Sequence, residues 1–131
     1  MYVMAVNMRV PFGKESFDHI PIEVMVDIVK TKKIYELQDV AERVWFGTDT
    51  NVRMFGPKLC QIWNGDKWVT RDIEEISYRM LETMCEGLCG KLNGLMSQED
   101  HSWVASIPKM RGREVQFVLK GLQRLIAMSG P

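Results

Sequence analysis

The sequence has no excess of charge of either sign. Its 17 Lys and Arg residues are balanced by 17 Asp and Glu residues, which gives a formal net charge of +0 at pH 7. A chain without bulk positive charge is not drawn as a whole to nucleic acid or to an anionic membrane. Binding to such a partner would therefore depend on a local basic patch.

Long apolar runs and paired cysteines are also missing. No run approaches the roughly 20 apolar residues of a membrane-spanning helix, so we expect no association with a membrane. The opening MYVMAVNMRV lacks the basic region and the unbroken apolar core of a signal peptide. The 3 cysteines are an odd set, which argues against a closed disulfide framework. We expect an intracellular protein with reduced thiols.

Recognisable catalytic motifs are absent as well. The sequence has no glycine-rich phosphate loop, no Gly-X-Ser-X-Gly and no paired acidic motif. The Glu-Asp-His run at 99–101 is the nearest approach to an acid–base cluster, and a solvated loop is its simpler interpretation. We expect no enzymatic activity and no cofactor.

A zinc site has only partial support. Cys85 and Cys89 are four residues apart on a predicted helix and share a face. With His19 or His101 they would complete a tetrahedral site. They also lie on or beside an apolar stripe, where a free cysteine is a small buried hydrophobic residue. We therefore predict no bound metal.

The sequence does contain enough apolar material for one core. Hydrophobic residues make up 46% of the 131 positions, and the 10 methionines suit irregular gaps in a core or adaptable contact surfaces. A chain of this length is most often one domain. We predict a single domain over 1–131.

The clearest local pattern is a hairpin that runs into a helix. From Leu59 to Trp63 the side chains alternate as the two faces of a strand do. Asn64-Gly65 is the preferred pair for a type I′ turn, in which both central residues have positive φ. We expect Trp63 and Trp68 to pair across the strands in a small core. A stacking platform for a base or a sugar is the alternative.

A long amphipathic helix is predicted directly after the hairpin, over 73–92. Thr70 or Asp72 can serve as its N-cap, and with Asp72 in that role Glu75 falls at the capping-box spacing. The glycines near the end predict that the helix stops between Gly90 and Asn93. Its apolar, methionine-containing face is our candidate contact for a partner or a second copy, represented by Ile73, Met80, Met84 and Leu88.

The rest of the chain reads as short strands and helices. For 21–30 an alternating strand competes with a helix, which we favour because Pro21 suits a first helical turn. The fold class is therefore α+β, a short antiparallel β-meander packed with about four helices. The predicted elements are a strand at 2–10, helices at 21–30, 34–47 and 111–128, strands at 51–55, 58–63 and 66–69, and a polar loop at 93–100.

The two helices 21–30 and 34–47 have the outline of a helix-turn-helix. The second helix, however, carries Glu36, Asp39 and Glu42 against a single arginine. Phosphate binding needs the opposite sign of charge. We therefore interpret this pair as a packing unit.

The segment 109–124 is the best candidate for an anion-binding surface, although a solvated helix face is the simpler alternative. It holds one acid, Glu114, and five basic residues, Lys109, Arg111, Arg113, Lys120 and Arg124.

Four short motifs follow one another between 43 and 81. They are VWFG at 44–47, NVRM at 51–54, CQIWNGDKW at 60–68 and RDIEEI at 71–76. In this order they resemble a module found at the C-terminal ends of many uncharacterised proteins of large double-stranded DNA viruses. In relatives the module often follows a zinc finger or a viral DNA-binding domain. The resemblance implies a viral accessory protein in the host cell cytoplasm or the virion.

Two functions fit these observations. The first is a non-enzymatic viral interaction or assembly module that self-associates or binds other viral proteins, as a virion or replication-factory accessory protein. The second is a nucleic-acid-binding accessory protein that uses the basic segment 109–124.

Overall fold

The computed structural model describes residues 9–47 and 50–129, and these form an α+β fold. Three strands, β1 (Val52–Gly56), β2 (Leu59–Trp63) and β3 (Trp68–Asp72), make an antiparallel sheet in the order β1-β2-β3. The α-helices are α1 (Ile22–Thr31), α2 (Leu37–Trp45), α3 (Ile73–Lys91), α4 (Gln98–Ser106) and α5 (Arg113–Met128), and η1 (Ile34–Glu36) and η2 (Ile107–Lys109) are short 3-10 helices. The predicted fold class is confirmed.

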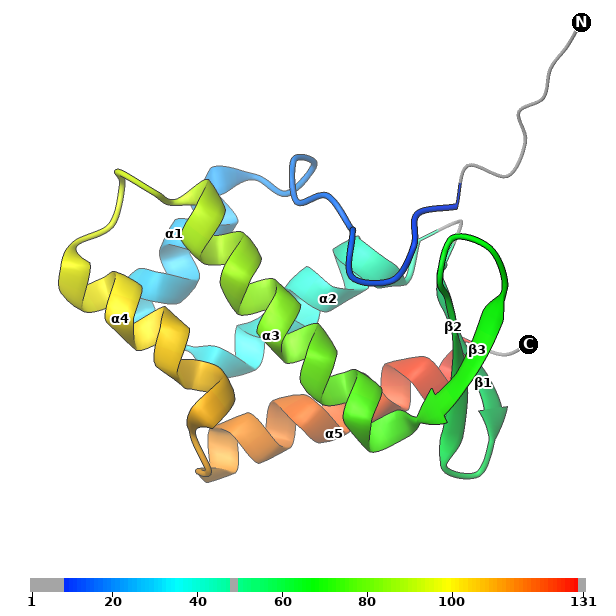
Figure 1. Cartoon of the computed structure of the whole chain (residues 1–131). Coiled ribbons are helices and arrows are strands. Elements are labelled where there is room, and N and C mark those ends of the chain that lie inside the picture. Colours follow the sequence, from blue (N-terminus) through cyan, green and yellow to red (C-terminus); the bar gives the residue numbers. More distant parts are fainter. Residues whose placement is uncertain (1–8, 48–49, 130–131) are drawn as a thin grey trace, which may run out of the picture.

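Helix α3 is the central element. It packs against α2, α4, α5 and the sheet. In Figure 1 the sheet stands at one end of the helical body, and α5 runs along the lower edge beneath α3. The apolar face of α3 is therefore covered on several sides by the rest of the chain.

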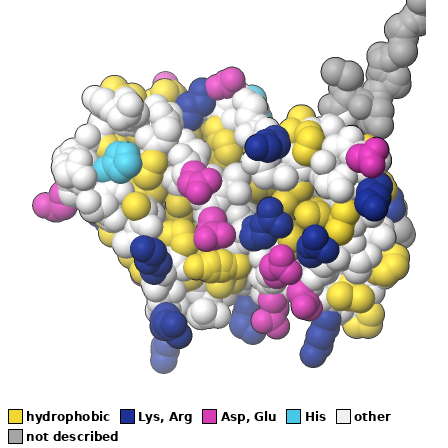
Figure 2. Space-filling view, in the orientation of Figure 1, with side chains coloured by type: hydrophobic (Ala, Val, Ile, Leu, Met, Phe, Trp, Pro, Cys, Tyr) yellow, Lys and Arg dark blue, Asp and Glu magenta, His cyan; other side chains and the backbone are white. Residues whose placement is uncertain are grey.

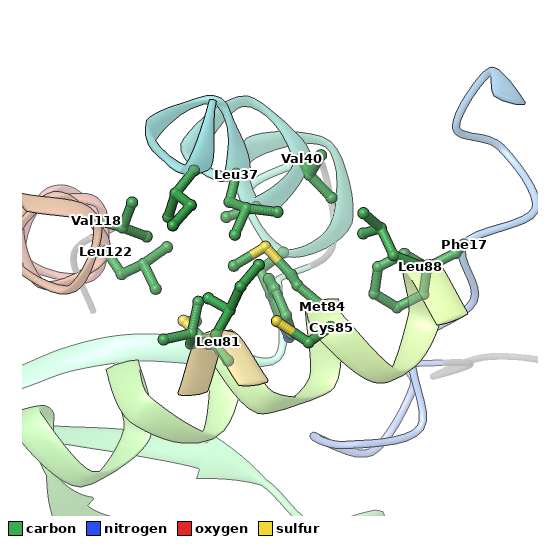
Figure 3. Close-up of a cluster of buried hydrophobic side chains, with 14 of the residues drawn as sticks. Phe17, Leu37, Val40, Leu81, Met84, Cys85, Leu88, Val118 and Leu122 are labelled. Carbon is green, nitrogen blue, oxygen red and sulfur yellow. The ribbon is translucent and has the colours of Figure 1, made fainter. Parts of the chain in front are cut away.

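The core lies where α2, α3 and α5 meet. Leu37 of α2, Met84 of α3 and Leu122 of α5 are all 0% exposed, and Figure 3 shows their side chains converging. Fully burying an aliphatic side chain of this size stabilises the fold by about 1.5–3 kcal/mol. The regular three- and four-residue spacing of apolar residues in the helices is thus explained by this shared interior.

The sheet presents one face to the helices. Val52, Cys60 and Ile62 are buried, and the strand register pairs Val52 with Ile62 and Met54 with Cys60. A buried Asn51 precedes β1, and its Nδ2 donates a 2.9 Å hydrogen bond to the carbonyl of Val10. This bond fixes the N-terminal segment against the sheet.

The turn between β2 and β3 differs from the prediction. Gly65 has a φ of 103°, but Asn64 is not among the described residues with positive φ. Instead, Asn64 Oδ1 accepts hydrogen bonds from the backbone N–H groups of Asp66 and Lys67, each 2.8 Å long. The type I′ assignment is therefore wrong. The longer loop delays β3, which begins at Trp68 rather than at 66.

A helix replaces part of the loop predicted at 93–100. Ser97 Oγ accepts a 3.1 Å hydrogen bond from the backbone N–H of Asp100 and caps the start of α4. Asp100 also pairs with Lys32 at 2.6 Å. The Ser-X-X-Asp spacing is a helix-start signal that the polar composition of the segment obscured.

Other local predictions have mixed outcomes. The helix favoured for 21–30 is confirmed as α1, and α3 ends at Lys91, within the predicted window. Asp72 occupies the N-cap position of α3, but its side chain makes no capping hydrogen bond, which corrects that expectation. Most of the strand predicted at 2–10 lies outside the described residues. Within the described ranges, no helix is long and apolar enough to cross a membrane.

Candidate functional site

The predicted contact face of α3 is buried. Met80 and Met84 are 0% exposed, Leu88 is 1% exposed and Ile73 is 8% exposed. These side chains pack the core instead of facing solvent. The prediction that they meet a partner is therefore wrong for the folded chain. The sequence pattern identified an apolar face correctly but could not say that α2 and α5 cover it.

Helix α5 has one buried face and one solvent face. Val115, Val118 and Leu122 lie on the buried face. Arg113, Lys120 and Arg124 follow one another at steps of seven and four residues, so they share the opposite face of the helix. All three are exposed.

The solvent face of α5 concentrates positive charge. Arg113 and Arg124 are eleven residues apart, so at 1.5 Å per residue the three cations span about 16 Å. Among the described residues the ion pairs are Lys32 with Asp100 and Lys91 with Asp18. The cations of α5 belong to neither pair. They are therefore available to an external anion.

A residue outside the predicted segment extends this face. Lys58, in the turn between β1 and β2, lines a hollow of about 370 Å³ together with Lys120, Arg124 and Glu74. The sequence offered no local signal for Lys58, because it joins α5 only through the docking of the sheet on that helix. We call Lys58, Arg113, Lys120 and Arg124 the basic face.

Figure 2 shows this charge distribution from one side. Dark blue Lys and Arg side chains project from the lower edge of the molecule, the edge along which α5 runs in Figure 1. Acidic side chains lie near the middle of the same edge, between the cations. The basic face is thus defined by its four residues on α5 and the sheet turn, on a protein of zero net charge.

The other two predicted basic residues lie elsewhere or at the margin. Lys109 belongs to η2 and lines a separate groove with Tyr78, Cys85 and Cys89. Arg111 is exposed in the segment before α5. Lys109 therefore borders a groove on α3 that none of the other four basic residues lines.

An aromatic hollow lies at the N-terminal end of the basic face. It measures about 350 Å³ and is lined by Tyr35, Arg113, Glu114 and Phe117. Phe117 is 54% exposed and Tyr35 is 46% exposed. Sequence reasoning missed both residues, since a single aromatic ring gives no sign of its exposure.

The cysteines have the character of structural residues. Burial is the main cause that raises the pKa of Cys85 to about 12 and that of Cys60 to about 11. Burial also raises the pKa of the half-buried Cys89. Both buried thiols therefore stay protonated near neutral pH, which does not suit nucleophilic attack.

The candidate zinc ligands weighed from the sequence do not come together. Across the described ranges, no group of three or more His, Cys, Asp or Glu side chains is arranged to hold a metal ion. His19 Nε2 donates a 2.8 Å hydrogen bond to the carbonyl of Arg43, and His101 lies in the first half of α4.

The two hairpin tryptophans contact each other as predicted. The ring centroids of Trp63 and Trp68 are 5.6 Å apart in an edge-to-face arrangement. The guanidinium of Arg53 lies 3.9 Å from the Trp68 centroid, and that of Arg9 lies 5.0 Å away. Because the chain's own arginines stack on Trp68, this pair is a weaker candidate for a base platform than the aromatic hollow beside α5.

Comparison with known proteins adds no assignment. The chain matches no protein family model, no curated protein and no solved structure. The resemblance to the viral module stays a prediction.

Proposed function

We propose that this protein is a non-catalytic binding module that holds the phosphate backbone of a nucleic acid on its basic face. The observation that carries the proposal is the alignment of Arg113, Lys120 and Arg124 on the solvent side of α5, with Lys58 beside them. Lys and Arg side chains on phosphates release condensed counterions, which drives binding independently of sequence.

Charge also argues against a second copy as the occupant of this face. Two α5 helices packed against each other would place cations of one copy beside cations of the other. Like charges at such short range repel and destabilise the contact. The core position of Met80, Met84 and Leu88 removes the observation that first suggested self-association. An anionic polymer fits the basic face better.

The viral resemblance supports a setting for this activity. As part of the same proposal, the protein is an accessory factor of a large DNA virus that works in the host cell cytoplasm or within the virion. Detection of the protein in purified particles or at cytoplasmic replication sites would support that setting. Secretion of the protein would count against it.

The test is a comparison of two triple variants that lose the same charge. In the first, Arg113, Lys120 and Arg124 become Ala. In the second, three exposed cations outside α5 become Ala, namely Lys14, Lys30 and Arg43. Fluorescence anisotropy with a labelled oligonucleotide at about 50 mM salt measures affinity. We expect the first variant to bind at least about tenfold more weakly, and the second to bind nearly as the natural chain does.

Two results would contradict the proposal. One is the absence of binding by the natural chain at low salt. The other is an equal loss in both triple variants, because binding would then follow net charge and not the basic face. Circular dichroism of each variant controls for the fold, and all six substituted side chains are exposed.

A further inference from the structure

The aromatic hollow lies next to the cations of the basic face. Arg113 contributes to both, since it lines the hollow and shares the solvent face of α5 with Lys120 and Arg124. Phe117 follows Arg113 by one helical turn and precedes Lys120 on the same exposed side. An aromatic ring thus interrupts a line of cations.

The elements that carry the two rings, η1 and α5, pack against each other. Ile34 of η1 and Val118 of α5 are buried, and they flank Tyr35 and Phe117 in the sequence. Gln38 Nε2 donates a hydrogen bond of 3.5 Å to the carbonyl of Phe117. The hollow is therefore built on helical elements and is formed in the free protein.

Leaving two aromatic rings in water has an energetic cost. Each of the two residues is about half exposed, and apolar surface left in water forgoes the favourable free energy of burial. The lining also holds one cation, Arg113, and one acid, Glu114, and Lys120 and Arg124 follow Arg113 on the same side of α5. The occupant that suits both features has a flat apolar part and an anionic part.

We infer that the aromatic hollow stacks an unpaired base, so that the basic face prefers single-stranded nucleic acid to duplex. This inference rests on the proposed function and names its substrate class. A cationic surface with interleaved aromatic rings is how proteins hold single strands without reading their sequence. In a duplex the bases are stacked inside, so Tyr35 and Phe117 cannot reach their faces. Phosphates are equally accessible in both forms.

The volume of the hollow agrees with this occupant. At about 350 Å³ it falls in the range of small-molecule sites, which is room enough for one base. A base stacked there would leave its phosphates beside Arg113, and the strand could then continue towards Lys120 and Arg124.

The experiment compares a 12-nucleotide oligo-dT with a duplex of the same length. The natural chain is expected to bind the single strand several-fold more tightly. Phe117→Leu and Tyr35→Ala should each weaken single-strand binding at least about fivefold, as loss of a stacked base does, and leave duplex binding unchanged. Phe55→Leu is the matched control, because Phe55 is an aromatic residue of similar exposure, 56%, on the sheet.

The outcomes separate this inference from the proposed function. If Phe117→Leu and Tyr35→Ala bind single strands normally while the α5 triple variant does not, the inference is overturned and the proposed function stands. Equal losses on single strand and duplex would also overturn it, because the rings would then serve the backbone contact or an apolar partner. If the natural chain binds neither probe, both fail.

Discussion

Gly87 of α3 lies against the ring of Phe17. A Cβ atom at this position would lie 2.8 Å from two ring carbons of Phe17, which is itself buried. Such a distance is too short for carbon atoms, so the ring or the helix would have to move. We predict that Gly87→Ala lowers the free energy of unfolding by about 1–3 kcal/mol, as overpacking does. Urea denaturation followed by circular dichroism measures it.

Gly90, in the same helix, provides the matched control. Apart from its chain neighbours and the backbone of its own helix, no atom lies within 4 Å of the position its Cβ would take, and the residue is exposed. Gly90→Ala should therefore raise the free energy of unfolding by up to about 1 kcal/mol, because alanine favours the helix. Equal effects at the two glycines would show that Phe17 does not fill the space beside Gly87.

The buried thiols predict a loss of stability at alkaline pH. Folding raises the pKa of Cys85 from 9.0 to about 12 and that of Cys60 from 9.0 to about 11. Above pH 9 the unfolded chain releases these protons and the folded chain retains them. The free energy of unfolding should therefore fall as pH rises from 9 to 10.5, by on the order of 1 kcal/mol per pH unit for each thiol.

Cys85→Ala isolates the thiol contribution from other groups that titrate in this range. The variant should lose stability less steeply with pH than the natural chain does. Urea denaturation measures the free energy of unfolding of both proteins at each pH. If it fell equally steeply in the two, the raised pKa of Cys85 in the folded chain would be contradicted.

At the scale of elements, the start of α4 depends on one side chain. Ser97 Oγ satisfies the backbone N–H of Asp100. We predict that Ser97→Ala lowers the free energy of unfolding by about 0.5–2 kcal/mol, the usual effect of losing an N-cap. Ser102→Ala is the control, because Ser102 is exposed inside α4 and alanine suits a helix interior. A smaller loss at Ser97 than at Ser102 would refute the capping role.

Element identities followed from the sequence more readily than element boundaries did. The alternation in 59–63 and the apolar stripe in 73–91 depend on neighbours along the chain, so local reasoning found β2 and α3. The side-chain hydrogen bonds of Asn64 determined the length of the hairpin loop. The residue preferences that predict a turn type take no account of such side-chain hydrogen bonds. The predicted start of β3 was therefore two residues too early.

Lys58 and Lys109 test whether the sheet turn belongs to the basic face. Lys58→Ala should weaken nucleic-acid binding and reduce the dependence on salt by about one released counterion. Lys109→Ala should change little, because Lys109 borders the groove beside Cys85 and Cys89. Anisotropy titrations of both variants measure the difference. A larger effect from Lys109 than from Lys58 would contradict the division of the basic residues described above.

At the scale of the whole molecule, a zero net charge conceals local asymmetry. The basic face gathers on α5 and the adjacent sheet turn, where Glu74 and Glu114 stand beside it, and other exposed acids such as Asp39, Glu82 and Glu86 lie on α2 and α3. The count of basic residues along the sequence identified the segment 109–124. It could not show that Lys109 borders another groove, or that Lys58 lies beside α5. Nor could it tell that the apolar face of α3 was covered, because burial depends on packing between distant segments.

The central claim is that phosphates bind the basic face, and the salt dependence of binding tests it most directly. The measurement is the slope of log affinity against log salt concentration for a single-stranded oligonucleotide. With four cations engaged, the natural chain should give a slope of about −3, and the variant that lacks Arg113, Lys120 and Arg124 should give about −1. Equal slopes for the two proteins would contradict the claim.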